Sequence, residues 1–99
     1  MKNNILETIG ETPLVRLNKL VDSIEATVCA KLEFFNPGLS TKDRIVMKII
    51  TEAEKNGLIQ PGDTLIEATS GNTGISIAMV AKVKGYKCIL CVTDYIAEE

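Results

Sequence analysis

The run YKCILCV at residues 86–92 is the feature that most limits what this chain can fold into. A strand that is apolar almost throughout is typical of a parallel sheet covered on both faces. Two further runs, at 26–35 and 64–68, also read as strands, and each is followed by a stretch with helical character. The order strand, helix, strand, helix, strand with short loops predicts a parallel α/β sheet with right-handed crossovers.

The first helix has clear start and stop signals. Ser40 is expected as its N-cap, with Asp43 at the third helical position completing a short-armed capping box. Gly57 is expected to end the helix in the left-handed conformation. Its apolar residues fall on one helical face: Ile45, Val46, Ile49, Ile50 and Ala53.

The second helix is expected over roughly 73–84, closed by Gly85, and largely buried because apolar residues cover most of its circumference. Outside this alternation, LVRL at 14–17 follows Pro13 and suits a short strand. The last stretch, TDYIAEE at 93–99, has the composition of a third helix start, where α/β topology requires more strands. We therefore expect an N-terminal fragment of a longer protein.

Composition excludes several classes of function. Ninety-nine residues, 45% hydrophobic and 24% charged, predict one small globular domain at most. A net charge of −2 offers no footprint for nucleic acid, and no run approaches the ~18 apolar residues of a membrane span. Three cysteines without an export signal fit reduced thiols in the cytoplasm. The absence of His removes His-based triads and His-containing metal sites, and we expect no metal.

Cys88 and Cys91 form a C-x-x-C pair that we interpret as structural and buried. Positions three apart in a strand point to opposite faces, so the thiols should diverge. A zinc site would also need a second ligand pair, which the chain lacks. Glu67 and Asp94 lie at expected strand ends, and we interpret them as structural or solvated.

Lys42 is the first candidate for chemistry because it stands at a helix start, where the helix dipole disfavours a cation. A nucleophilic amine needs a pKa several units below the usual ~10.4 of lysine. The dipole supplies only ~0.3–1 kcal/mol, so burial or conversion to a Schiff base must supply the rest. From position alone, the alternative is a surface lysine whose charge is offset by Asp43.

TSGNTG at 69–74 is the second candidate, because small residues between a strand and a helix let backbone N–H groups converge on an anion. Its polar side chains add further donors: Thr69, Ser70, Asn72 and Thr73. Gly71 and Gly74 have the wrong spacing for a Walker A loop or a dinucleotide fingerprint. A carboxylate or a phosphate would fit equally well. The alternative is a turn whose small residues merely allow close packing.

Together these segments resemble the N-terminal part of cysteine synthases (O-acetylserine sulfhydrylases), in the tryptophan-synthase-β-like, fold-type II group of pyridoxal-phosphate enzymes. The resemblance runs in order and spacing through ETIGETPLVRL, KLEFFNPGLSTKDRI, AEKNGLIQPGDTLIEATSGNTGISIA and KGYKCIL. It implies an incomplete three-layer α/β fold. Residues 1–40 would pack on the larger domain of such an enzyme, and 41–99 would form part of its smaller domain. A homodimer is implied for the full-length family.

The resemblance also implies the roles of the two candidate sites. Lys42 would be the Schiff-base lysine that holds the cofactor's aldehyde and later moves the substrate's α-proton. The substrate's α-carboxylate would be gripped by Thr69, Ser70, Gly71, Asn72 and Thr73, with Asn72 also bonding the ring hydroxyl of the cofactor. The implied reaction is β-replacement, in which O-acetylserine loses its leaving group and sulfide adds to give cysteine.

Departures from the family keep several readings open. The family's phosphate cradle lies downstream of this stretch, and Ala68 replaces a common proline. We therefore expect little or no turnover from the chain by itself. The chain could instead belong to a cystathionine β-synthase or diaminopropionate-forming relative, or be a non-catalytic remnant or partner-binding segment. It could also be an anion-binding module working through 69–74 without the cofactor.

Overall fold

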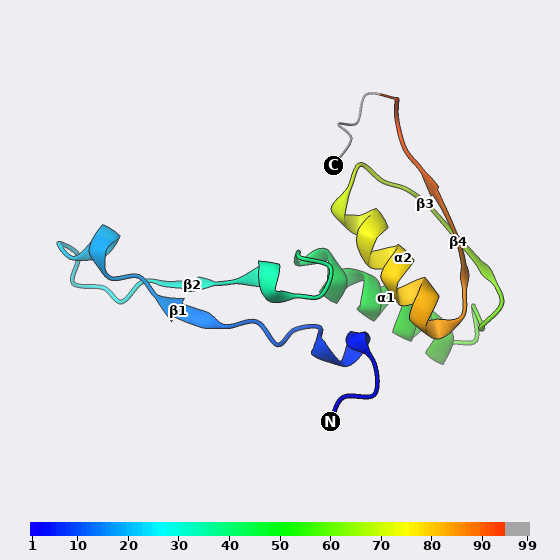
Figure 1. The fold of residues 1–99 in the computed structure, drawn as a ribbon, viewed down its shortest axis with the longest axis horizontal. Coiled ribbons are helices and arrows are strands. Elements are labelled where there is room, and N and C mark those ends of the chain that lie inside the picture. The colour runs from blue at the N-terminus through cyan, green and yellow to red at the C-terminus, as the bar shows by residue number, and fades with distance from the viewer. Residues whose placement is uncertain (95–99) are drawn as a thin grey trace.

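Two small β-ladders and two α-helices organise the chain in the computed structural model, which describes residues 1–94 (Figure 1). α1 (Lys42–Lys55) precedes the strand β3 (Thr64–Ala68). α2 (Asn72–Lys84) then connects β3 to β4 (Lys87–Cys91), and the two strands pair in parallel along their whole length. The predicted α/β class is confirmed. None of the helices in this described part is long and apolar enough to span a membrane.

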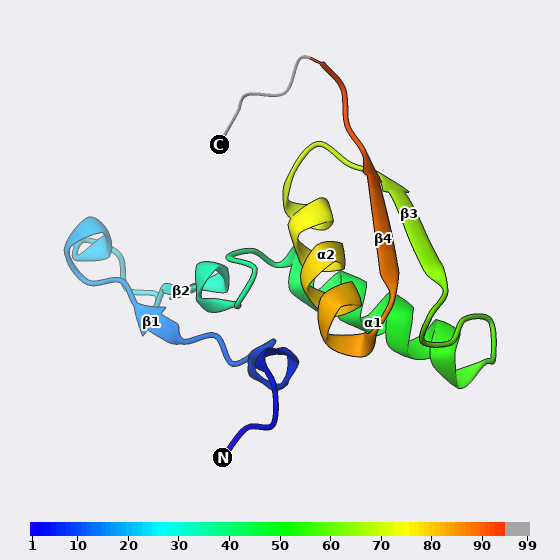
Figure 2. The ribbon, with the colours of Figure 1, turned by 45° about the vertical axis from the view of Figure 1, so that its right-hand side comes forward.

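The strand predicted at 26–35 is wrong in its length and in its partner. β2 covers only Cys29–Lys31 and pairs antiparallel with β1 (Leu14–Arg16), not with β3. Three short 3-10 helices complete the N-terminal part: η1 (Ile5–Thr8), η2 (Lys19–Val21) and η3 (Glu33–Phe35). Figures 1 and 2 show β1 and β2 in an arm that extends away from the helices. Apolar composition identified β2 as a strand, but composition does not indicate which other strand it pairs with.

The core lies where α2 packs between α1 and the parallel ladder (Figures 1 and 2). Its buried apolar residues come from η1, both helices and the turn before β4: Leu6, Val46, Ile50, Ile77, Val80, Ala81 and Tyr86. Val80 is fully buried, whereas Ile75 and Val83 on the same helix are exposed. The prediction that α2 is buried is therefore correct for one side of the helix only. Gly85 ends the helix, as predicted, and adopts the left-handed conformation.

The parallel ladder has one packed face and one bare face. Cys88 is half-buried against the core, but Cys91 is exposed, so the prediction of buried cysteines is wrong for Cys91. Ile66 and Ile89 lie opposite each other in the ladder and are 65% and 51% exposed. No residue in the described range 1–94 covers this second face.

The start of α1 differs from the predicted capping box. The Ser40 hydroxyl accepts the Lys42 N–H at 3.2 Å, but Thr41 directly precedes the helix and its side chain caps nothing. Asp43 does not reach back to the Ser40 N–H. Its carboxylate is fully buried, and Oδ2 accepts the Gly38 N–H at 2.6 Å instead. The carboxylate therefore stabilises the loop before the helix rather than the helix terminus itself.

Arg44 joins α1 to the N-terminal arm. Its Nε donates to Glu33 Oε2 at 2.9 Å. Its Nη2 donates to Thr12 Oγ1 at 2.8 Å and to the Gly10 carbonyl oxygen at 3.2 Å. These bonds form a clamp that links the two parts predicted from the sequence to lie in different domains, residues 1–40 and residues 41–99. That division into domains stays a prediction. These interactions hold Gly10, Thr12 and Glu33 against the first turn of α1.

The clamp predicts a pH dependence of stability. The Arg44 guanidinium holds the pKa of the Glu33 carboxyl below its usual value in the folded chain. A carboxyl whose pKa is lower when folded stabilises the chain above its unfolded pKa, and this contribution disappears as the pH falls through the lowered folded pKa. Glu33→Gln should therefore flatten the loss of stability below about pH 5.

The measurement is the urea midpoint from pH 7 to pH 3, followed by circular dichroism. Glu52→Gln is the matched control, because the side chain of Glu52 pairs within residues 1–94 only with the exposed Lys48, at 2.8 Å. It should leave the acid limb of the profile unchanged. An identical acid limb in the wild type and in Glu33→Gln would contradict the prediction.

Candidate functional site

The two predicted sites lie at the starts of the two helices. Lys42 is the first residue of α1, and residues 69–71 lead directly into α2. The start of α1 lies beside the first turns of α2 in both views (Figures 1 and 2). A hydrogen bond joins these turns, since Ser76 Oγ donates to Asp43 Oδ1 at 2.6 Å. The fold thus brings the segment that carries Lys42 close to the helix that follows the loop.

Lys42 is half-buried, and its amine has no hydrogen bond or ion pair within residues 1–94. The neighbouring Asp43 turns inward, where its two oxygens accept from Gly38 and Ser76. The alternative in which Asp43 offsets the charge of Lys42 therefore does not match this geometry. No carboxylate of the described chain competes for the amine.

Thr69 organises the predicted anion loop in a way the sequence did not reveal. Its Oγ1 accepts the N–H groups of Gly71 at 3.2 Å and Gly74 at 3.1 Å. Its own N–H donates to the Cys91 carbonyl oxygen at 3.0 Å, which fixes the loop to the end of β4. The signal was present as a threonine shortly before a helix start, where a hydroxyl commonly accepts free N–H groups.

Three backbone N–H groups of the loop remain free. Those of Ser70, Asn72 and Thr73 have no partner within the described residues. They lie within four consecutive residues at the start of α2, where the helix dipole favours negative charge. Three N–H donors and the neighbouring hydroxyl groups are thus available to an anion at this loop, and the binding of a carboxylate there stays a prediction.

The two loop glycines have different reasons to be glycine. A Cβ at Gly74 would lie 2.7 Å from Thr69 Cγ2 and 3.2 Å from Leu90 Cδ1, so close packing explains this position. A Cβ at Gly71 would meet nothing within 4 Å. The packing alternative therefore accounts for Gly74 and leaves Gly71 unexplained. A small residue at Gly71 is what close approach of a ligand to the loop would require.

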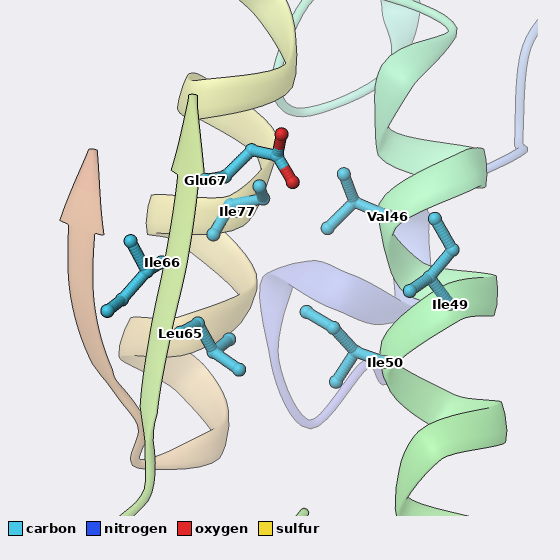
Figure 3. Close-up of a pocket in the computed structure, with 7 residues that line it drawn as sticks. All are labelled: Val46, Ile49, Ile50, Leu65, Ile66, Glu67 and Ile77. Carbon is cyan, nitrogen blue, oxygen red and sulfur yellow. The ribbon is translucent and has the colours of Figure 1, made fainter. Parts of the chain in front are cut away.

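Two hollows lie on the described surface. One of about 280 Å³ adjoins the loop, the first turns of α2 and the end of β4, and is lined by Thr69, Ser70, Gly71, Gly74, Ile75, Ala78, Leu90 and Val92. The other, of about 180 Å³, lies between α1 and β3 and is lined by Val46, Ile49, Ile50, Leu65, Ile66, Glu67 and Ile77. In Figure 3 the Glu67 carboxylate projects into the space between β3 and α1, among apolar side chains. This second hollow is lined by no predicted site residue, whereas the hollow at the loop is lined by Thr69, Ser70 and Gly71. Lys42, Asn72 and Thr73 line neither of the two.

Ser76 is a further residue that the sequence did not single out. It is fully buried, and its hydroxyl also lies 3.1 Å from the Asn72 carbonyl oxygen. Its signal was a lone hydroxyl in a helix that is otherwise apolar from Ile75 to Ala81. A buried hydroxyl of this kind needs a partner. The sequence alone did not reveal that the partner is Asp43.

Comparison with known sequences gives matches over nearly the whole chain. A family model described as pyridoxal-phosphate-dependent enzyme matches residues 5–99. A cystathionine beta-synthase of Dictyostelium discoideum is 53% identical over 97 residues, which cover 98% of this chain and 20% of that protein. A probable cysteine synthase of Bacillus subtilis (strain 168) is 54% identical over 96 residues, covering 97% and 31%. The chain thus spans about a fifth to a third of these relatives.

Comparison with solved structures agrees. The crystal structure of O-ureido-L-serine synthase superposes with a TM-score of 0.92 at 45% identity, covering 98% of this chain and 30% of that one. A hydrogen sulfide-producing enzyme from Fusobacterium nucleatum gives a TM-score of 0.90 at 48% identity, covering 98% and 32%. The N-terminal arm is included in this agreement, because the superposed region is almost the entire chain.

Proposed function

Because the chain belongs to the family of pyridoxal-phosphate-dependent enzymes, we propose that it carries the reactive lysine and the carboxylate loop of an enzyme that performs β-replacement on an O-activated serine. The observation that carries the proposal is the placement of the Lys42 amine, which is half-buried and unpaired within residues 1–94, at the start of α1. It lies there beside the helix that follows a loop with three N–H donors that are free in the same range. O-acetylserine is the proposed substrate, sulfide the nucleophile and cysteine the product.

The residues present fit two groups of pyridoxal phosphate, its aldehyde and its ring hydroxyl. Lys42 would hold the cofactor's aldehyde, since no carboxylate within residues 1–94 occupies its amine. Asn72 would bond the ring hydroxyl, because its side-chain amide is exposed and has no partner in the described chain. When bound, the pyridine ring acts as an electron sink for negative charge at the substrate's Cα.

The chain's own residues would bind the substrate and move one proton. The N–H groups of Ser70, Asn72 and Thr73 would receive the substrate's α-carboxylate. Thr69 Oγ1 already accepts two N–H groups, so its own proton remains available as a fourth donor. Fixing the carboxylate fixes the direction of the Cα–H bond, which is a positioning effect. The Nζ atom of Lys42 would then take the α-proton as a general base.

A second candidate reaction is that of cystathionine beta-synthases, in which the same loop and lysine would serve a different nucleophile. Its support is the relative from D. discoideum, whose 53% identity nearly equals the 54% of the probable cysteine synthase. A diaminopropionate-forming enzyme would use yet another nucleophile, and a non-catalytic remnant would use none. We further propose that the enzyme is a cytoplasmic homodimer that acts on a small amino acid.

The test is to mix the chain with pyridoxal phosphate, reduce with borohydride, and locate the stable label by peptide mass spectrometry. We expect the label at Lys42. Serine should lower the labelling more than ethanolamine at equal concentration, because only serine offers a carboxylate to the loop at 69–74 while both amines compete for the aldehyde. Labelling spread evenly over the exposed lysines, or equal competition by both amines, would overturn the proposed function.

A further inference from the structure

A buried carboxylate and a buried hydroxyl connect the starts of the two helices. Asp43 on α1 and Ser76 on α2 are both 0% exposed, and Ser76 Oγ lies 2.6 Å from Asp43 Oδ1. The other oxygen of Asp43 accepts the Gly38 N–H, also at 2.6 Å. A carboxylate is rarely removed from water unless both of its oxygens are bonded, and here both are.

The connection reaches a predicted site residue on each side. Asp43 directly follows Lys42 in the chain. The Ser76 hydroxyl has one proton and two acceptors in range, the Asp43 carboxylate at 2.6 Å and the Asn72 carbonyl oxygen at 3.1 Å. The shorter, charge-assisted bond takes the proton. The path therefore runs from Lys42 through Asp43 and Ser76 to the first turn of α2, where Asn72 lies.

We propose that Asp43 and Ser76 are positioning residues that set the spacing between the Lys42 segment and the loop at 69–74. The proposal rests on the proposed function for its chemical meaning, but the link itself is a property of the chain. Neither residue would touch substrate. Their effect would be to hold the amine and the carboxylate donors in one geometry, where small displacements reduce reactivity strongly.

The same helix pair has a second link at its other end, which supplies a matched comparison. Tyr86 donates its hydroxyl proton to Glu54 Oε2 at 2.7 Å, and Lys84 Nζ lies 2.6 Å from Glu54 Oε1. This link also joins a hydroxyl to a carboxylate of α1, but it lies far along the helices from Lys42. The bonds of Glu54 and the apolar core thus already hold α1 against α2 without the Asp43–Ser76 bond. A buried polar pair at the functional end suits a role in specifying geometry.

The experiment compares Ser76→Ala with Tyr86→Phe, since each variant removes one hydroxyl bonded to a carboxylate. Amide hydrogen exchange without cofactor is the first readout. We expect Ser76→Ala to raise exchange about tenfold at the bonded N–H groups of 38–44 and at those of Gly71 and Gly74, as expected for one lost buried hydrogen bond. Tyr86→Phe should leave both segments unchanged. The second readout is the borohydride-trapped pyridoxal label at Lys42, for which Ser76→Ala should need about tenfold more cofactor.

Asp43→Asn is the conservative variant. Its amide can accept from Gly38 and donate to Ser76, whose proton can then go to the Asn72 carbonyl oxygen. It should keep most of the wild-type protection and labelling. Unchanged exchange at both segments in Ser76→Ala would overturn the positioning role, and so would raised exchange with unchanged labelling. A wild-type chain without label at Lys42 would contradict the proposed function, while the exchange comparison would still decide whether the link exists.

Discussion

Lys42→Ala is expected to abolish the borohydride-stable pyridoxal label that we predict on Lys42. The amine is half-buried and unpaired within residues 1–94. Lys42 is also the only lysine in that range that is directly followed by a carboxylate bonded to α2, namely Asp43, which accepts from Ser76. Any β-replacement turnover should fall by about 100- to 10,000-fold, the range by which a positioned proton-transfer group accelerates a reaction. Peptide mapping measures the loss of the label, and an assay of cysteine formation measures the loss of turnover.

Lys48→Ala is the control for the lysine experiment, because Lys48 lies on the same helix and makes only an exposed pair with Glu52. It should leave the label at Lys42 and any turnover unchanged. Circular dichroism should show that both variants keep the helical content of the wild type. A label that stays equally strong in Lys42→Ala would contradict the assignment of this residue.

Gly38→Ala is expected to lower the free energy of unfolding by about 3–5 kcal/mol, the range for breaking a buried charged interaction. A Cβ at this position would lie 2.1 Å from Asp43 Oδ1 and 2.9 Å from Oδ2, closer than real contacts allow. Either the carboxylate leaves its buried site or the loop before Lys42 moves. Both routes break the bond between the Gly38 N–H and Asp43. The urea midpoint, followed by circular dichroism, measures the loss.

Gly71→Ala is the matched control for this substitution, because a Cβ there would meet nothing within 4 Å. It should change stability by well under ~1 kcal/mol, as for a surface substitution without steric conflict. Asp43→Ala combined with Gly38→Ala gives a second check. The double variant removes the clash, so its loss should be clearly smaller than the sum of the two single losses. A stable Gly38→Ala variant with additive effects would show that the close approach is not present.

The helices and the candidate site could be predicted because their signals are local. The apolar periodicity of α1 and the glycine after α2 are visible within a few residues of the chain. Lys42 and the loop at 69–74 were likewise found from their positions at expected helix starts, and the resemblance to a family then added roles for them. The structure places the segment that carries Lys42 beside the helix that follows the loop, and the roles of both sites stay predictions.

The remainder depended on contacts between distant parts of the chain. Arg44 bonds Thr12 and Gly10, which lie more than thirty positions earlier, and Ser76 bonds Asp43 over a similar separation. Side-chain periodicity cannot report such pairs. The same holds for β2. Its composition predicted a strand, but only the structure showed that the strand pairs antiparallel with β1. The capping box failed for a related reason, since Asp43 found a stronger set of partners than a helix cap could offer.

The bare side of the parallel ladder makes the chain sensitive to its surroundings. Ile66 and Ile89 present adjacent branched side chains to water on a face that no helix of residues 1–94 covers. Burying an isoleucine is worth roughly 1.5–3 kcal/mol, so even a partial cover would add measurably to a small protein's margin of stability. Whatever layer comes to rest there, whether more of the same polypeptide or a neighbour in a crowded solution, would stabilise the folded state by simple mass action.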